Sequence, residues 1–185
     1  MSEIRVDNIT NEAGTGKPGF PNGITATGAA LTDPEITGGI YLGGTGSANY
    51  LEDYEEGTWT PTYETSNGDF SGTMNVNLAN YTKVGRSVVC NARFFVSGAS
   101  GTGDLRISGL PFSVIGAQVT VSIGQSLRFV SNPPVSGYIV NSTKVLLLSA
   151  AYVTASSITR TQGSDLSGSN GQNIMSISVS YETND

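Results

Sequence analysis

The sequence predicts an all-β fold, in which a glycine-rich, extended N-terminal segment is followed by an antiparallel β-sandwich of the jelly-roll type. Three observations lead to this fold class. Charged residues make up only 13% of the chain, glycine accounts for 24 of 185 residues, and runs of strong helix formers are absent. Apolar and polar residues alternate along several stretches of the second half. Clusters of turn-forming residues separate those stretches.

The first expected region, residues 1–48, has isolated apolar residues among glycine and threonine, as in GTGKPGFPNGITATG and ITGGIYLGGTGSAN. One chain cannot bury such separated side chains in a core of its own. The segment is either a disordered tail or a stalk held by other copies of the chain or by another protein, and we favour the stalk. A parallel homotrimer would gather the apolar side chains around an axis, where glycine permits close approach of the backbones. The apolar residues are Ile4, Val6, Ile9, Phe20, Ile24, Leu31, Ile36, Ile40 and Leu42.

The second expected region, residues 49–63, is an acidic linker with the sequence NYLEDYEEGTWTPTY. In an extended chain Asp53 and Glu55 would lie on one face about 6.5–7 Å apart, a separation that suits inverting glycoside hydrolysis. Together with Glu52 and Glu56 they could also supply oxygen ligands to calcium, although no Asp-x-Asp-x-Asp-Gly loop is present. We interpret the stretch instead as a solvated, metal-free hinge.

Aromatic residues are expected to pin this hinge to the following domain. Trp59 and Tyr63 share one face of TWTPTYE, and Pro61 between them restricts that strand to a sheet edge or to the start of a strand. Tyr54 is the third expected pin. The sequence therefore predicts a largely buried Trp59 beside solvated carboxylates.

The third expected region, residues 64–185, forms the C-terminal β-sandwich domain with roughly ten strands. Four stretches show a period of two, which is typical of half-buried strands: SVVCNARFFVS, DLRISGL, QVTVSIG and IMSISVSYE. The side chains expected to face the core are Val88, Cys90, Ala92, Phe94, Val96, Leu105, Ile107, Val119, Val121, Ile123, Met175, Ile177, Val179 and Tyr181.

Several kinds of chemistry are disfavoured by composition. The chain has no histidine, which removes the commonest general base, the serine and cysteine triads and most zinc sites. Cys90, the single cysteine, lies mid-strand on the apolar face without a basic partner, so we expect a buried, inert thiol. GGTG and GTGDL lack the lysine and the following helix of a phosphate-binding loop. We therefore expect no enzyme activity and no cofactor.

The charge distribution also bears on partners. Residues 1–64 contain ten acidic and two basic side chains, whereas residues 65–185 contain five acidic and seven basic ones. No cluster of lysine and arginine suits a phosphate backbone, so we expect no nucleic acid partner. MSEIRVDNIT lacks a signal-peptide pattern, and the apolar run VLLLSAAYV is too short to span a bilayer. We expect folding in a cytosol and no membrane insertion.

Some exposed side chains have two interpretations. A solvated surface or a subunit interface would explain the basic residues on predicted outward faces, and contact with acidic glycans is the functional alternative. Similarly, three tyrosines could form a sugar platform, but stalk packing is the simpler interpretation. The basic residues are Lys83, Arg86, Arg93, Arg106 and Arg128, and the tyrosines are Tyr41, Tyr50 and Tyr54.

Most of residues 1–112 consists of segments with a recognisable order. These are EIRVDNITNEAG and GFPNGITATG at the start, followed by NYLEDYEEGTWTPTYE, ANYTKVGR and TGDLRISGLPF. They resemble segments that occur in this order in bacteriophage tail fibre proteins and related virion fibre proteins. The resemblance implies a homotrimeric fibre of the virion, assembled in the bacterial cytoplasm. Its N-terminal segment would attach to a phage tail or capsid protein, and a β-sandwich would end the chain. The resemblance implies no catalytic residues.

The sequence thus predicts a structural virion protein, most simply a tail fibre whose C-terminal domain binds a host surface glycan or protein. The alternatives are a capsid-decorating head fibre or cement protein and, less favoured, a polysaccharide depolymerase. Receptor contacts are expected on loops 98–103, 131–137 and 163–173, because binding residues concentrate on loops of a rigid scaffold. Candidate contact residues in or beside these loops are Asn132, Tyr138, Asp165 and Asn170.

Overall fold

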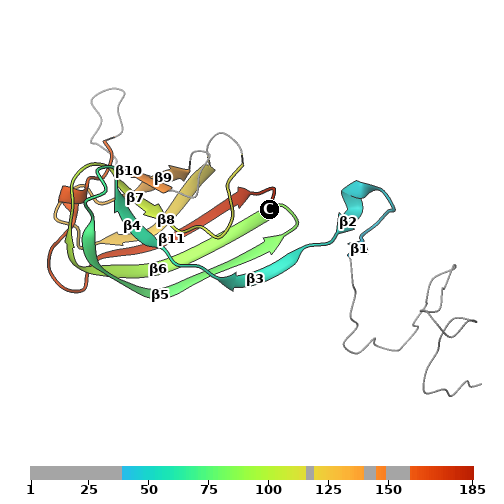
Figure 1. The fold of residues 1–185 in the computed structure, drawn as a ribbon, viewed down its shortest axis with the longest axis horizontal. Coiled ribbons are helices and arrows are strands. Elements are labelled where there is room, and N and C mark those ends of the chain that lie inside the picture. Colours follow the sequence, from blue (N-terminus) through green and yellow to red (C-terminus); the bar gives the residue numbers. More distant parts are fainter. Residues whose placement is uncertain (1–38, 116–118, 140–144, 149–158) are drawn as a thin grey trace, which may run out of the picture. The chain divides into compact units, whose positions relative to one another are not determined.

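The computed structural model describes residues 39–115, 119–139, 145–148 and 159–185 (Figure 1). The chain divides into two units, Met1–Thr37 and Gly38–Asp185, and the second contains every described residue. Most of the expected stalk, with seven of its nine apolar residues, therefore lies outside the described residues. Ile40 and Leu42 lie within them.

The prediction of an all-β, antiparallel fold is confirmed. Helical structure in the described ranges is confined to two single 3-10 turns, η1 (Ser47–Asn49) and η2 (Gly163–Asp165). No helix in these ranges is long and apolar enough to cross a membrane. The strands of the main sheet are β3 (Tyr54–Thr58), β4 (Thr62–Thr65), β5 (Ser71–Val84), β6 (Ser87–Ser100), β7 (Leu105–Ser108), β8 (Val119–Leu127), β9 (Ser136–Ile139), β10 (Val145–Leu148) and β11 (Gln172–Glu182).

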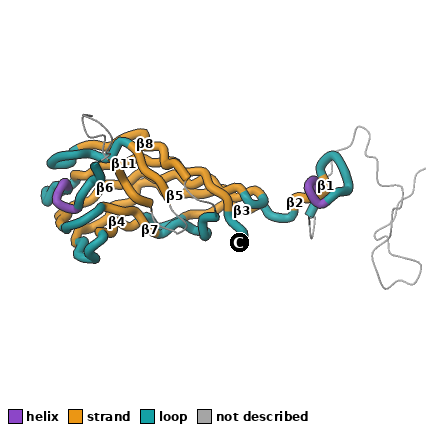
Figure 2. Tube along the Cα trace, turned by 90° about the horizontal axis from the view of Figure 1, so that it is seen from above, coloured by secondary structure: helices purple, strands orange, loops and turns teal. Residues whose placement is uncertain are grey.

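These nine strands form one antiparallel sheet in the order β3-β5-β6-β11-β8-β9-β10-β7-β4. β3 and β4 lie at opposite edges of the sheet, yet only residues 59–61 separate them in the chain. The sheet must therefore fold over so that its edges approach each other, which gives two sandwich-like layers (Figures 1 and 2). The ring of Tyr63 in β4 meets that of Phe94 in β6 edge-on, with centroids 5.4 Å apart, between the layers.

The core residues follow the alternation in the sequence. Every inward residue expected on β6, β7 and β11 is buried, and so is Val121 on β8. Val119 and Ile123 are partly buried and pack against the same core. The prediction of half-buried strands is confirmed for β6, β7, β8 and β11, because side chains on one face of these strands are buried and those on the other face are more exposed.

The sheet has two distinct ends. At the end that we call the linker end, Gly85 and Arg86 form the turn between β5 and β6, and β3 begins beside it, with Tyr54 opposite Val84. At the opposite end, which we call the loop end, four connecting segments gather (Figure 2). These segments are 66–70, 101–104, 128–135 and 159–171.

A separate two-stranded hairpin precedes the main sheet. β1 (Ile40–Tyr41) pairs with β2 (Tyr50–Leu51), and the rings of Tyr41 and Tyr50 stack with centroids 4.8 Å apart. Ile40, Tyr41 and Leu42 remain exposed. The hairpin thus presents large apolar side chains that its own residues do not cover.

Candidate functional site

Two of the three expected pins hold the acidic linker to the sheet. Trp59 is 7% exposed, and its indole Nε1 donates a hydrogen bond to the backbone oxygen of Asn91 at 3.2 Å. Tyr63 is also buried, which raises the pKa of its hydroxyl. The prediction that Tyr54 is a pin is wrong. Tyr54 is 64% exposed on the outer face of β3, where its hydroxyl donates to Glu56.

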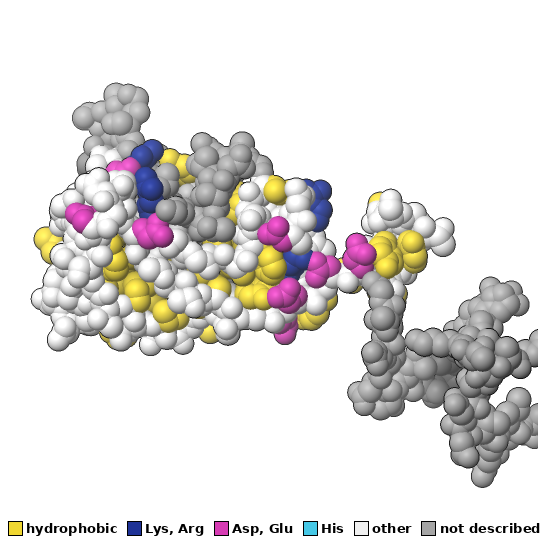
Figure 3. Space-filling model, in the orientation of Figure 1, with side chains coloured by type: hydrophobic (Ala, Val, Ile, Leu, Met, Phe, Trp, Pro, Cys, Tyr) yellow, Lys and Arg dark blue, Asp and Glu magenta, His cyan; other side chains and the backbone are white. Residues whose placement is uncertain are grey.

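The carboxylates of the linker have different surroundings. Glu52, Glu55 and Glu56 are exposed, as expected, and acidic side chains gather at the linker end in Figure 3. Asp53 is only partly exposed, because its Oδ2 forms an ion pair with Lys83 Nζ. The described ranges contain no group of three or more metal-ligating side chains placed to hold an ion.

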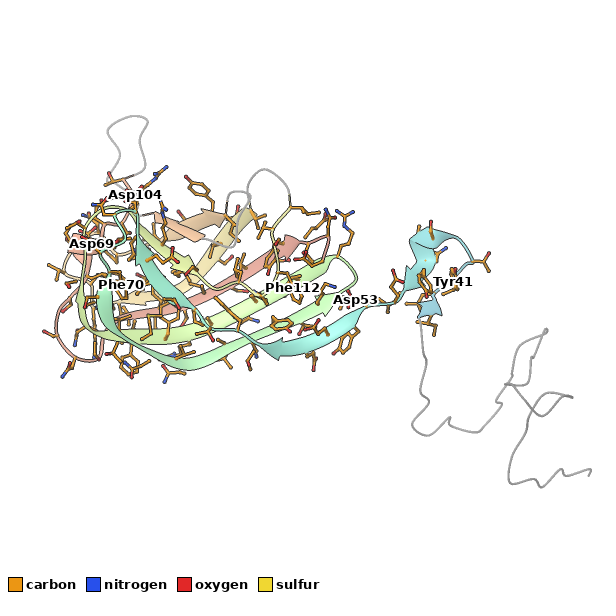
Figure 4. All side chains as sticks on the ribbon, in the orientation of Figure 1. Tyr41, Asp53, Asp69, Phe70, Asp104 and Phe112 are labelled. Carbon is orange, nitrogen blue, oxygen red and sulfur yellow. The ribbon has the colours of Figure 1, made fainter. Side chains whose placement is uncertain are left out.

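The prediction that Lys83 points outward is wrong. Lys83 lies opposite Val88 on the inner face of the sheet and is 2% exposed. Its Nζ lies 5.4 Å from the centroid of the Phe112 ring, and Asp53 supplies the opposite charge at the linker end (Figure 4). An inward lysine is tolerated here because it has both partners. Arg86, Arg93 and Arg128 are exposed and Arg106 is partly exposed.

Two further contacts join β3 to β5. The Tyr81 hydroxyl donates a hydrogen bond to Glu55, which raises the pKa of that hydroxyl. Gly57 lies opposite Tyr81, and a Cβ at Gly57 would come within 2.6 Å of the Tyr81 hydroxyl oxygen. From Tyr54 onward the expected linker is therefore a strand of the main sheet.

Cys90 is buried, as expected. Burial raises the pKa of its thiol to about 11, and its Sγ lies 3.9 Å from the Tyr181 hydroxyl oxygen. A thiol with a raised pKa is a poor nucleophile at neutral pH. This environment favours a structural role.

At the loop end, the buried side chain of Asp165 joins two connecting segments. Its Oδ1 accepts hydrogen bonds from Ser131 Oγ at 2.5 Å and from Asn132 Nδ2 at 3.1 Å. Its Oδ2 accepts from the backbone nitrogen of Gln162 at 2.7 Å. The backbone oxygen of Asp165 accepts from Val130 nitrogen at 2.8 Å. These bonds satisfy the buried carboxylate and hold segment 128–135 against η2.

The structure brings together some of the four expected contact residues. Asn132 and Asp165 are hydrogen-bonded to each other. Asp165 is only 4% exposed, so its side chain holds the neighbouring loop and offers almost no surface for contact with a receptor. Tyr138 lies on β9, where its hydroxyl accepts a hydrogen bond from Arg160 Nη2 at 3.2 Å. Asn170 is exposed in segment 159–171.

Two more carboxylates stabilise the loop end, and sequence reasoning missed both (Figure 4). Asp69 accepts hydrogen bonds from the Thr102 hydroxyl at 2.5 Å, the Thr102 nitrogen at 2.9 Å and Thr65 Oγ1 at 2.6 Å, and these bonds lower its pKa to about 2. Asp104 accepts from Gln162 Nε2 at 3.0 Å and Arg160 Nη1 at 2.6 Å, which lowers its pKa. A sequence signal existed, since each aspartate lies in a turn cluster with a hydroxyl residue nearby, SNGDFSG and SGTGD.

Backbone strain is concentrated at the same end. Among the non-glycine residues described, a positive φ occurs at Arg128 (62°), Asn132 (38°) and Asn173 (54°). Arg128 and Asn132 lie in segment 128–135, and the nitrogen of Asn173 donates to the backbone oxygen of Arg128 at 3.3 Å. Such conformations persist only where surrounding bonds hold them, and they occur often at functional sites.

The strained segment also exposes apolar side chains. Val130 is 69% exposed, Val135 52% and Leu127, at the end of β8, 46%. Large apolar side chains on a segment held by several hydrogen bonds form a ready contact surface, because little further ordering is needed on binding.

A pocket of about 590 Å³ opens beside β4 and the turn that follows it. Its lining includes the polar side chains of Thr62, Glu64, Ser66 and Asn67, the ring of Phe70 and the side chain of Arg106. The Phe70 ring packs edge-on against Tyr63 with centroids 5.9 Å apart. The pocket therefore combines hydrogen-bonding groups with an aromatic ring of fixed position.

Comparisons of the chain with models of known protein families, with curated proteins and with solved structures gave no match. A functional proposal therefore depends on the sequence resemblance of residues 1–112 and on the geometry of the loop end.

Proposed function

We propose that this protein is a structural fibre protein of a bacteriophage virion that has no enzyme activity and presents its loop end to a receptor on the host surface. The resemblance of residues 1–112 to such proteins supports the general class. The fold agrees with it, since an antiparallel sheet with loops gathered at one end is a suitable scaffold for a binding surface.

The observation that carries the receptor assignment is the rigid presentation of segment 128–135. Asp165 holds this segment through Ser131 and Asn132, while Val130 and Val135 face solvent. Positive φ at Arg128 and Asn132 and two exposed valines in one segment are features that binding surfaces often combine. A receptor that covers these valines explains both features.

The proposal also includes a parallel homotrimer attached to the phage through its N-terminal segment. Ile40, Tyr41 and Leu42 support it, because the hairpin leaves all three side chains exposed. Other copies of the chain would bury them against equivalent residues, as interfaces between permanent partners do.

Adsorption of phage to host cells tests the receptor assignment. Val130→Ser combined with Val135→Ser should lower the adsorption rate, because it removes apolar contact area without disturbing the core. The matched control is Val84→Ser with Val89→Ser, two exposed valines on β5 and β6 away from the loop end. Equal adsorption of both variants would contradict the proposal.

Two further measurements separate the other functional classes. Density for this protein on the tail in images of the particle agrees with a tail fibre, whereas density on the capsid surface indicates a head fibre or cement protein. Release of reducing ends from purified host polysaccharide by the full-length protein would identify a depolymerase and contradict the absence of enzyme activity.

A further inference from the structure

The polar side chains of segment 128–135 are already bonded within the protein. The segment contains three of them, Arg128, Ser131 and Asn132. Ser131 Oγ and Asn132 Nδ2 both donate hydrogen bonds to the carboxylate of Asp165. Arg128 Nη1 donates to a backbone oxygen at 3.4 Å. The segment therefore has few hydrogen-bonding groups left for a ligand.

The surface that the segment presents to solvent is mainly aliphatic. Val130 and Val135 are exposed, whereas Phe129, the one aromatic residue of the segment, packs against the core. Pro134 is buried as well, and it follows a second proline, Pro133. Two prolines and a buried ring restrict the backbone, so the valines are presented at little cost in conformational entropy.

A glycan fits this surface poorly. Each sugar hydroxyl that is buried on binding needs a hydrogen-bond partner, and two valines supply none. A charged glycan would also need opposite charges, and Arg128 is the one charged side chain of the segment. The chemistry of the segment therefore favours a partner that is itself apolar at the point of contact.

A second copy of the chain also fits poorly. Permanent interfaces between copies bury roughly 2,000 Å² or more, with about 20–30 residues on each side in an interface of standard size. The large apolar side chains that segment 128–135 and the adjoining end of β8 expose are only Val130, Val135 and Leu127. This small set suits a contact with a partner that binds reversibly.

We propose that the partner of this surface is a folded protein on the host surface, whose apolar side chains close over Val130 and Val135. This inference rests on the proposed receptor-binding function and names the chemical class of the receptor. A protein surface is suitable because about 56–58% of a typical interface area is apolar. It can cover aliphatic side chains without leaving hydroxyl groups unpaired.

Binding of fluorescently labelled full-length protein to intact host cells tests the inference. One portion of the cells is treated with proteinase K, which digests exposed surface proteins, and another with periodate, which opens sugar rings that carry neighbouring hydroxyls. Proteinase K should abolish binding, and periodate should leave it unchanged. Loss of binding after periodate, or binding that survives proteinase K, would overturn the inference while receptor binding itself stands.

Two variants test the apolar contact on untreated cells. Val130→Ser with Val135→Ser should weaken binding roughly 10-fold or more, because the apolar area that the receptor covers is lost. Val130→Ile with Val135→Ile keeps the apolar character and should bind nearly as well as the wild type. Both positions are exposed, so the melting temperature of either variant should stay near that of the wild type. Undiminished binding of the serine variant, or equal weakening of both variants, would overturn the apolar contact.

Sedimentation equilibrium of the serine variant tests the remaining occupant, a second copy. Its mass should equal that of the wild type, and a lower mass would place the valines between copies and overturn the inference. Wild-type protein that binds no untreated cells would instead contradict the proposed receptor-binding function. The failure of the inference and the failure of the proposed function therefore give different results.

Discussion

Asp53 and Lys83, thirty residues apart in the chain, form an ion pair that joins the start of the acidic linker to the inner face of the sheet. The lysine side chain is 3% exposed and the aspartate side chain 37%. Lys83 is thus the member of the pair that depends on its partner, since the charge of a buried ammonium group needs compensation. The contact fixes the point at which the chain enters the main sheet.

Replacing Asp53 by Asn should lower the free energy of unfolding by about 3 kcal/mol, the low end of the range for breaking a buried pair, because Asp53 is partly exposed. Adding Lys83→Met to this variant should restore most of the loss, since no buried charge then remains. Urea titration monitored by circular dichroism measures both effects. Glu52→Gln, an exposed neighbour, should change the stability by less than about 0.5 kcal/mol. Equal losses in the Asp53 and Glu52 variants would show that the ion pair contributes nothing.

Trp59→Ala should lower the free energy of unfolding by about 3–5 kcal/mol, because it leaves a cavity and removes the hydrogen bond to Asn91. Tyr54→Ala is the control, and its effect should be below about 1 kcal/mol because the side chain is exposed. Circular dichroism is the appropriate readout, since Trp59 is the only tryptophan of the chain. A loss below that of Tyr54→Ala would exclude Trp59 from the core.

The pH dependence of stability should report on Asp69. Its pKa of about 2 in the folded protein is lower than the value of about 3.9 expected in the unfolded chain. The stabilisation is therefore fully present above about pH 4 and is lost as the pH falls toward about 2, because the unfolded state then binds the proton more strongly. In Asp69→Asn, the melting temperature should be lower at pH 7 and should fall less between pH 4 and 2. An unchanged acid slope would show that Asp69 does not stabilise the loop end.

Asp165→Asn should loosen segment 128–135, because an amide has one acceptor oxygen where the carboxylate uses two. We expect a loss of about 2–3 kcal/mol in the free energy of unfolding. Hydrogen exchange should become faster at the amides of Val130 and Gln162, which bond directly to Asp165. Asn170→Ala, in an exposed turn, should leave these amides unchanged. Equal exchange rates in the wild type and Asp165→Asn would show that the Asp165 side chain does not hold segment 128–135 against η2.

Sedimentation equilibrium of the full-length protein should give a mass about three times the 19.2 kDa of one chain. Replacing Tyr41 and Leu42 together by Ser should weaken association, because their exposed side chains are proposed to lie between copies. Tyr54→Ser provides a control with an exposed tyrosine on β3. A stable monomer with a folded N-terminal segment would contradict the trimer.

The strands and their inward faces could be predicted because alternation is a local property. A period of two along SVVCNARFFVS places Val88, Cys90 and Phe94 on one side of any strand, whatever its neighbours. The burial of Trp59 could be predicted in the same way, because Trp59 and Tyr63 lie on one face of the strand-like stretch TWTPTYE. These predictions needed no knowledge of strand order.

Less of the candidate site could be predicted from the sequence. Loops 131–137 and 163–173 could be recognised from their turn residues, but not the hydrogen bonds of Asp165 to Ser131 and Asn132. Asp69 and Arg160 were missed for the same reason, since their partners come from other connecting segments. Such pairs are set by which loops share an end of the sheet, and that follows from strand order rather than from local pattern.

The sequence by itself thus determined the all-β class, the strand faces and the burial of Trp59 and Cys90, because each depends on side-chain spacing and hydrophobicity along the chain. Only the tertiary structure decided the positions of Lys83 and Tyr54. Lys83 lies inside because β5 carries it to the inner face, where Asp53 and Phe112 compensate its charge, and Tyr54 lies outside because β3 pairs with β5 in the register that places it opposite Val84. Both outcomes depend on contacts between strands, and the free energy of those contacts outweighs the preference of either side chain for water or for the core.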